Sequence, residues 1–305
     1  MAFFANIFGY ILNFIYELVK NYGLAIIIFS ILVKVAMIPI SIKQQKTMKK
    51  STKIQAKMKE IQLKYKNNPE KLNQETIELY RSENMSPFSG CLSAIIQIVL
   101  LFSVFFLVKS PLTHMKKVDP VVIDKYVKIM QQNELSATNS GYPEIELIRE
   151  SENIRKLKEQ ENTETENKEE NEDKISLSEI KDEEIDSLYI NMDFLGVNLA
   201  QVPTKSSDWK AYIIPVLYVI ISMISMKITN VSTPKVENTD KKEGEEEFDP
   251  MAQMNKNMNL MFPILYVSVA LVAPLGLALY WLMNSLLMII EKLALNKLLK
   301  DEEEA

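Results

Sequence analysis

The 305-residue sequence has one cysteine, Cys91, and one histidine, His114. A single cysteine excludes a disulfide within the chain, and with only one histidine beside it too few ligands remain for a thiolate cluster or a two-histidine zinc motif. Glycine is also scarce, at seven residues, and no GxGxxG, Walker-type or GxSxG pattern occurs. We therefore predict no metal, no cofactor and no catalytic residue, and we do not expect an enzyme.

What the sequence has in abundance is apolar residues gathered in blocks, with the charges between them. About 20 apolar residues are needed for a helix to cross a bilayer, and blocks of that kind occupy 22–42, 91–108, 211–228 and 258–291. The last block is long enough for two crossings and is interrupted at Ala273-Pro274-Leu275-Gly276, so we divide it into 258–272 and 275–291. The prediction is an all-α integral membrane protein with a five-helix transmembrane core.

Lysine and arginine in short loops set the orientation of such a protein. Residues 43–90 are rich in lysine, which places this segment in the cytoplasm. Counting the spans onward puts the N-terminus and residues 109–210 outside, and the 229–257 linker and the short 292–305 tail inside. We expect a multi-pass protein of the cell membrane.

Residues 1–21 carry apolar side chains at helical spacing, with Asn6, Asn13 and Glu17 on the opposite face. This pattern is typical of an amphipathic helix that lies in the membrane interface. A cleavable signal peptide is the competing interpretation, but the segment lacks a basic n-region and a small-residue cleavage site.

The basic segment 43–90 has apolar residues recurring among its lysines on both sides of Asn67-Asn68-Pro69. Asn68 suits an N-cap and Pro69 a first helical turn, so we predict a cytoplasmic helical hairpin. One interpretation is a solvated hairpin whose lysines only fix topology. The other is a basic face for anionic lipid, a nascent chain or ribosomal RNA, formed by Lys46, Lys49, Lys50, Lys53 and Lys57.

The outer segment 109–210 contains an acidic stretch, residues 150–174, that is almost free of large apolar residues. We expect disorder or a frayed, charged helix there, with no core built from it. Apolar residues return in 187–199, which we expect to pack on the outer ends of the spans. The 229–257 linker is solvated by composition.

Lys34 is a cation inside the first apolar block. A charge at the centre of a span costs about 2.5–3.5 kcal/mol on insertion scales, so its presence needs a cause. Snorkelling to the cytoplasmic face is one explanation, although Lys43 lies nine residues away, about 13 Å of helical rise. The other explanation is a wet, polar site within the bundle.

The chain resembles the YidC/Oxa/Alb membrane protein insertase family. The stretches that carry the resemblance are YGLAIIIFSILVKVAMIPISIKQQKTMKK, SPFSGCLSAIIQIVLLFSVFF, YIIPVLYVIISMISMKIT, and MNKNMNLMFPILY followed by PLGLALYWLMNSLLMII. They occur in the family's order, and the resemblance extends over nearly all residues outside an insertion at 112–186. Family members commonly have arginine at the position of Lys34 and glutamine at that of Ser225, and Val99 replaces a proline.

This resemblance implies a bundle of five helices around a water-filled groove that opens to the cytoplasm and to lipid. Lys34 would face the groove as its positive charge. Further groove contacts with substrate would come from Gln97, Ser225, Tyr280, Trp281 and Asn284. Each has a plainer alternative: interhelical contact for Gln97, interfacial or core packing for Tyr280 and Trp281, and packing for Asn284.

The implied function is insertion of hydrophobic segments of nascent membrane proteins into the lipid bilayer without nucleotide hydrolysis, beside the Sec translocon and the ribosome in some relatives. The rival hypothesis is a small transporter or channel with Lys34 as an anion site, but no internal repeat supports it. A membrane-bound enzyme would need carboxylates or histidines in the spans, and we expect none there.

Overall fold

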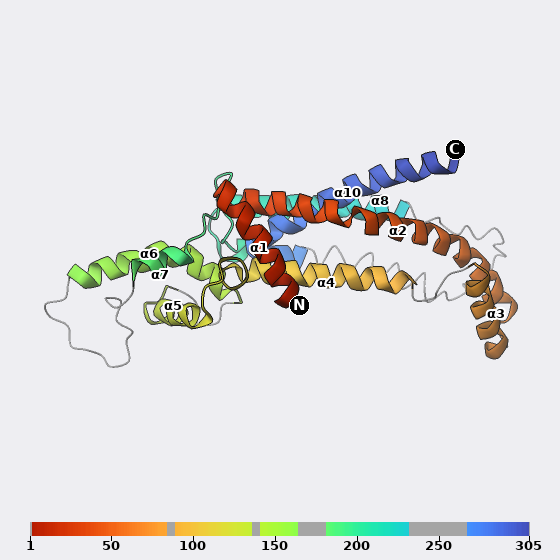
Figure 1. Cartoon of the computed structure of the whole chain (residues 1–305), viewed down its shortest axis with the longest axis horizontal. Coiled ribbons are helices and arrows are strands. Elements are labelled where there is room, and N and C mark those ends of the chain that lie inside the picture. Colours follow the sequence, from red (N-terminus) through yellow and green to blue (C-terminus); the bar gives the residue numbers. More distant parts are fainter. Residues whose placement is uncertain (1, 84–88, 136–140, 164–180, 232–266, 305) are drawn as a thin grey trace. The chain divides into compact units, whose positions relative to one another are not determined.

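The computed structural model describes residues 2–83, 89–135, 141–163, 181–231 and 267–304, which are mostly helical (Figure 1). The chain divides into two compact units. Unit 1 comprises Met1–Ile31, Leu100–Val219 and Leu265–Asn284, and unit 2 comprises Leu32–Val99, Ile220–Ile264 and Ser285–Ala305. Several long helices run from one unit into the other.

Three segments of the described part are helical, long and apolar enough to cross a membrane: Tyr22–Thr47, Trp209–Ile228 and Leu275–Leu298. They correspond to the predicted spans 22–42, 211–228 and 275–291, so an all-α membrane protein is confirmed. The predicted span 91–108 lies within helix α4 (Ser89–Lys109), of which only Ile98–Lys109 is described as a shorter apolar stretch. Most of 258–272 lies outside the described residues, and the five-helix core stays a prediction.

Two helices are longer than their apolar blocks. Helix α2 (Tyr22–Lys64) continues through Pro39 into the basic segment, and α10 (Leu275–Glu304) continues through the predicted tail. Lysine, glutamine, methionine and leucine all have high helix propensity, so these helices extend where the apolar pattern ends. The interruption at Ala273-Pro274 lies where the sequence predicts it, directly before α10.

Helix α3 (Pro69–Ser82) begins as the sequence predicts. The side chain of Asn68 accepts a hydrogen bond from the Lys71 backbone N–H, and Pro69 occupies the first turn. Side-chain contacts tie α3 and the residue that follows it to the end of α2: Tyr65 with Glu75, Met58 with Thr76, and Lys57 with Glu83.

In unit 1, helix α1 (Ala2–Val19) packs on η1 (Leu112–Lys116), a short π-helical turn. The approach is so close that a Cβ atom added to Gly9 would lie 1.8 Å from the carbonyl oxygen of His114. Glu17 accepts a hydrogen bond from Lys116 at 2.8 Å, and together with Lys20 this contact lowers the pKa of Glu17 to about 2. Another face of α1 is apolar and exposed, at Phe3, Ile7, Phe14 and Leu18.

The insertion folds into a helical cluster of α5 (Pro120–Gln132), α6 (Pro143–Thr163) and α7 (Asp182–Leu188), which lie together in Figure 1. Ile154 is fully buried in this cluster. The expectation that 150–174 contributes nothing to a core is therefore wrong for its helical part, because even one apolar side chain on a charged helix can face the neighbouring helices. Ion pairs from Arg155 to Asp186 and from Lys158 to Asp182 join α6 to α7.

A two-stranded hairpin follows, with β1 (Asp193–Phe194) antiparallel to β2 (Val197–Asn198). Leu195 and Gly196 have φ values of 51° and 77°, as the tight turn between twisted strands requires. Phe194 packs so closely on Gly23 at the start of α2 that no Cβ would fit there. Residues 187–199 thus pack on the start of α2, whereas their place on the outer side of the membrane stays a prediction.

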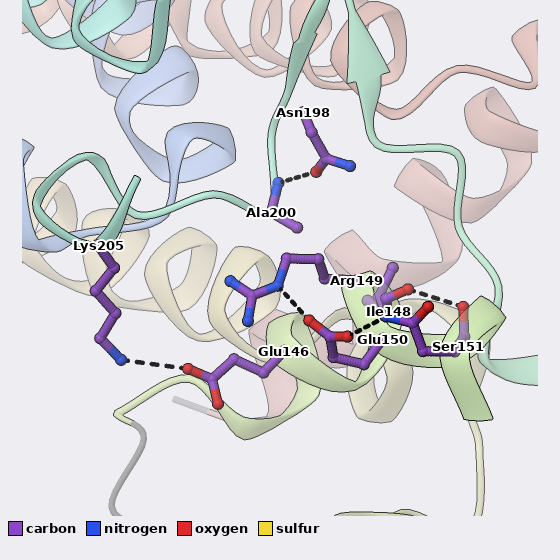
Figure 2. A network of polar contacts seen from close by, with 9 residues as sticks. Glu146, Ile148, Arg149, Glu150, Ser151, Asn198, Ala200 and Lys205 are labelled. Carbon is purple, nitrogen blue, oxygen red and sulfur yellow. Dashed lines mark hydrogen bonds and ion pairs between the residues drawn. The ribbon is translucent and has the colours of Figure 1, made fainter. Parts of the chain in front are cut away.

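The loop after β2 caps the N-terminus of α10. The backbone N–H groups of Leu275 and Gly276, which have no partner within the helix, donate to the carbonyl oxygens of Gln201 and Leu199 at 2.9 Å. Figure 2 shows how the same loop is held against α6, where Lys205 lies 3.3 Å from the buried carboxylate of Glu146. Within the loop, the Asn198 side chain accepts a hydrogen bond from the Ala200 N–H. This loop thus joins the insertion to the start of a candidate span.

Candidate functional site

The most prominent polar contact among the candidate spans lies in unit 2, between Lys34 of α2 and Glu291 of α10. Lys34 Nζ is 2.5 Å from Glu291 Oε2, and the two side chains are 18% and 13% exposed. The other carboxylate oxygen, Glu291 Oε1, is buried and has no hydrogen-bond partner among the described residues. The lysine therefore has a built-in counter-charge.

Two contacts between uncharged side chains also involve α10 in unit 2. Gln45 Nε2 donates to Asn296 Oδ1 at 2.5 Å between α2 and α10. The hydroxyls of Ser222 and Ser285 are 3.3 Å apart between α8 (Ile213–Val231) and α10. Ser225, a predicted groove residue, is buried in α8 one turn after Ser222. Polar side chains thus connect three apolar helices, as is common where helices meet within a membrane.

Three predicted groove residues belong to unit 1. Tyr280 is buried in α10, and the ring of Trp281 lies 5.9 Å from that of Tyr218 at an angle of 33°. Asn284 is half-buried. The Trp281–Tyr218 contact is the packing alternative that the sequence left open, whereas a shared groove with Lys34 stays a prediction.

The remaining predicted residues have less structural detail. Gln97 lies in α4, and its side chain is outside those that the structure describes. In the basic segment Lys46, Lys50 and Lys57 are exposed on α2, whereas the side chains of Lys49 and Lys53 lie outside the description. The exposed lysines are consistent both with a solvated face and with a binding face.

Glu291 is the residue that the sequence analysis missed. We expected no carboxylate in the five spans, and that expectation is wrong, because Glu291 is the last residue of the predicted span 275–291 and pairs with Lys34. Ionisable residues within membrane-spanning segments usually pair with one another. A search for one acidic residue to match Lys34 would have found it.

Removing either partner of this pair would leave a charge largely shielded from solvent, whereas the intact pair presents little net charge to its surroundings. No group of three or more histidine, cysteine, aspartate or glutamate side chains that could hold a metal ion occurs among the described residues.

The sequence profile of the 60Kd inner membrane protein family matches residues 14–303, almost the whole chain. The chain belongs to this family. The chain is also similar to curated proteins that are named membrane protein insertase YidC. The protein of Caldanaerobacter subterraneus subsp. tengcongensis is 37% identical over 110 residues, which cover 36% of this chain and 53% of that protein.

Two further relatives of the same name give similar values. The protein of Fusobacterium nucleatum subsp. nucleatum is 38% identical over 102 residues, or 33% of this chain and 50% of the relative. The protein of Chlorobaculum parvum is 45% identical over 100 residues, which cover 33% of this chain and 17% of that protein. The aligned part thus spans about half or less of these relatives. The family match over residues 14–303 and the candidate spans fit a multi-pass membrane protein.

Proposed function

We propose that the chain is a membrane protein insertase, which moves hydrophobic segments of nascent proteins from the cytoplasm into the lipid bilayer without nucleotide hydrolysis. Membership of the 60Kd inner membrane protein family and the name of the similar curated proteins support this function. The three candidate spans are consistent with it. The observation that carries the mechanism is the charged residue Lys34 in an apolar helix.

In this proposal Lys34, Gln97, Ser225, Tyr280, Trp281 and Asn284 contact substrate in a hydrophilic groove. The positive charge of Lys34 attracts acidic residues in the short outer segment of a substrate, since charges attract more strongly where the effective dielectric constant is low. Lysine offers a single point charge rather than the two-pronged fork of arginine. The groove therefore favours acidic segments without demanding one carboxylate geometry.

Transfer of the hydrophobic segment itself supplies the driving force. Removing apolar surface from water contributes about 25 cal/mol per Å², and a span of roughly 20 residues has ample surface for that. The predicted span 258–272 is short for a bilayer, about 23 Å at helical rise, so it would thin the membrane beside the groove. Neither step needs a cofactor.

The proposed topology has the N-terminus outside and the C-terminus in the cytoplasm, with α1 lying in the outer interface. The exposed apolar stripe of α1 supports the interfacial position. The exposed lysines of α2 would then meet anionic lipid, nascent chains or the ribosome on the cytoplasmic side. Work beside the Sec translocon is a further part of the proposal.

The test is substitution of Lys34 in an assay that follows insertion of a small single-span protein with one acidic residue in its outer segment. We expect Lys34→Ala to slow insertion roughly three- to ten-fold, the effect of about 1 kcal/mol of lost attraction, and Lys34→Glu to slow it further. Lys128→Ala, an exposed lysine of α5 in the insertion, is the control. Unchanged insertion in both Lys34 variants would contradict the proposed role of the charge.

The transporter alternative gives a different result in liposomes. A transporter with Lys34 as an anion site would carry small anions across a vesicle membrane, and Lys34→Ala would abolish that flux. We expect no such flux from the purified protein, while the same vesicles take up the test protein.

A further inference from the structure

The charge of Lys34 is already occupied in the protein itself. Its ammonium group lies 2.5 Å from Glu291 Oε2, and neither side chain is more than one-fifth exposed. A substrate carboxylate that approached this lysine would meet a pair of opposite charges rather than a free cation. Attraction at short range would then depend on separating that pair.

The pair is also incompletely satisfied. Glu291 Oε1 is buried and accepts no hydrogen bond from the described residues, and leaving a buried acceptor unfilled costs free energy. An arriving polypeptide carries backbone N–H donors as well as its carboxylate. Once Lys34 and Glu291 separate, the polypeptide therefore offers a carboxylate to Lys34 and N–H donors to Glu291.

The pair is not the only described polar contact between α2 and α10. A hydrogen bond between Gln45 and Asn296 joins the same two helices without any charge. A buried ion pair is in general no more stabilising than well-packed neutral side chains. A role in binding explains the two charges better than a role in stability.

We propose that Glu291 is the resting partner of Lys34 and that a substrate carboxylate binds by exchange, taking Glu291's place on the ammonium group. Glu291 then accepts backbone N–H groups of the substrate. The site thus selects polypeptide segments with a carboxylate among their polar residues, and Glu291 lowers the affinity for them so that they can leave. This inference rests on the proposed insertase function.

The test compares two versions of the single-span test protein, with aspartate or asparagine in the outer segment, on the full chain in membranes. Site-specific cross-linking of the outer segment to α2 measures binding, and protease protection measures insertion. In Glu291→Gln the competing carboxylate is gone, so we expect the cross-linking ratio of aspartate to asparagine substrate to rise roughly three- to ten-fold, the effect of one partly exposed ion pair. The double variant Lys34→Gln with Glu291→Gln is expected to bring the ratio to about one.

Asn296→Ala is the matched control, since it breaks the neutral contact between α2 and α10 and leaves both charges in place. We expect it to leave the ratio unchanged, and thermal unfolding of each purified variant identifies any that fails to fold. An unchanged or lower ratio in folded Glu291→Gln would overturn the exchange, even if Lys34→Ala slows insertion as proposed. If Lys34→Ala has no effect on the aspartate substrate, the proposed function of the charge fails first, and the two failures are distinguishable.

Discussion

Glu144 is a carboxylate in helix α6 of the insertion. Its side chain is buried and accepts hydrogen bonds from the backbone N–H of Thr113 at 3.0 Å and from the Thr113 hydroxyl at 2.6 Å. Burial raises the pKa of Glu144 above its ordinary value, because desolvation outweighs these hydrogen bonds. This residue therefore links the docking of α6 on η1 to pH.

The sign of the pH dependence follows from the raised pKa. Between the unfolded value of 4.5 and the higher folded value, the folded state binds more protons than the unfolded state. We therefore expect the Glu144 contribution to stability to be full below pH 4.5 and to be lost as the pH rises through the folded pKa. Hydrogen exchange of the η1 amides, corrected for intrinsic rates, measures this docking.

Glu144→Gln is the control for that experiment, since an amide does not titrate and still offers an oxygen to Thr113. Protection in this variant should vary less with pH than in the wild-type protein. Equal pH profiles for the two proteins would show that another group controls the docking of α6.

The packing of α1 on η1 depends on a glycine. With no side chain at Gly9, the helix backbone lies directly on the carbonyl of His114. Lys117 strengthens the contact: it ends η1 with a φ of 59°, donates to Asn6 at 2.9 Å and lies 4.5 Å from the ring centre of Tyr10. Helix α1 and the η1 turn of the insertion therefore pack closely against each other.

Gly9→Ala is expected to force the two elements apart and to destabilise unit 1 by about 1–3 kcal/mol, the usual cost of overpacking. Thermal unfolding of the protein in nanodiscs and hydrogen exchange of α1 measure the change. Gly141→Ala is the matched control, because a Cβ there meets nothing within 4 Å. Similar unfolding temperatures for the two variants would contradict the close contact.

The whole molecule consists of two units, with long helices that run from one into the other. Unit 1 holds the folded insertion and the N-terminal ends of α2 and α10, and unit 2 holds the Lys34–Glu291 pair and the basic part of α2. In the proposed topology, the insertion lies outside the cell and the basic part of α2 lies in the cytoplasm.

Single-cysteine reporters test this topology in cells. After Cys91→Ser, Leu195→Cys at the exposed turn of the hairpin is expected to react with a membrane-impermeant thiol reagent from outside. Leu63→Cys, exposed near the end of α2, should react only after the membrane is permeabilised. The reverse pattern would invert the proposed orientation, and Cys91→Ser alone shows the background.

Local properties of the chain were enough to predict the candidate spans 22–42, 211–228 and 275–291, the cap at Asn68 and the break at Pro274. Apolar length, capping chemistry and the missing N–H of proline act within a few residues, so they can be read along the chain. Lys34 stood out for the same reason, since its charge contrasts with its immediate neighbours.

Contacts between residues far apart in the chain required the folded structure. Glu291 looked like the polar end of a span until α10 brought it to Lys34, and Ile154 looked isolated until α6 packed against its neighbours. The carbonyls that cap α10 come from the loop after β2. In each case burial and pairing depend on which helices meet, and that is decided by packing over the whole chain rather than by any local pattern.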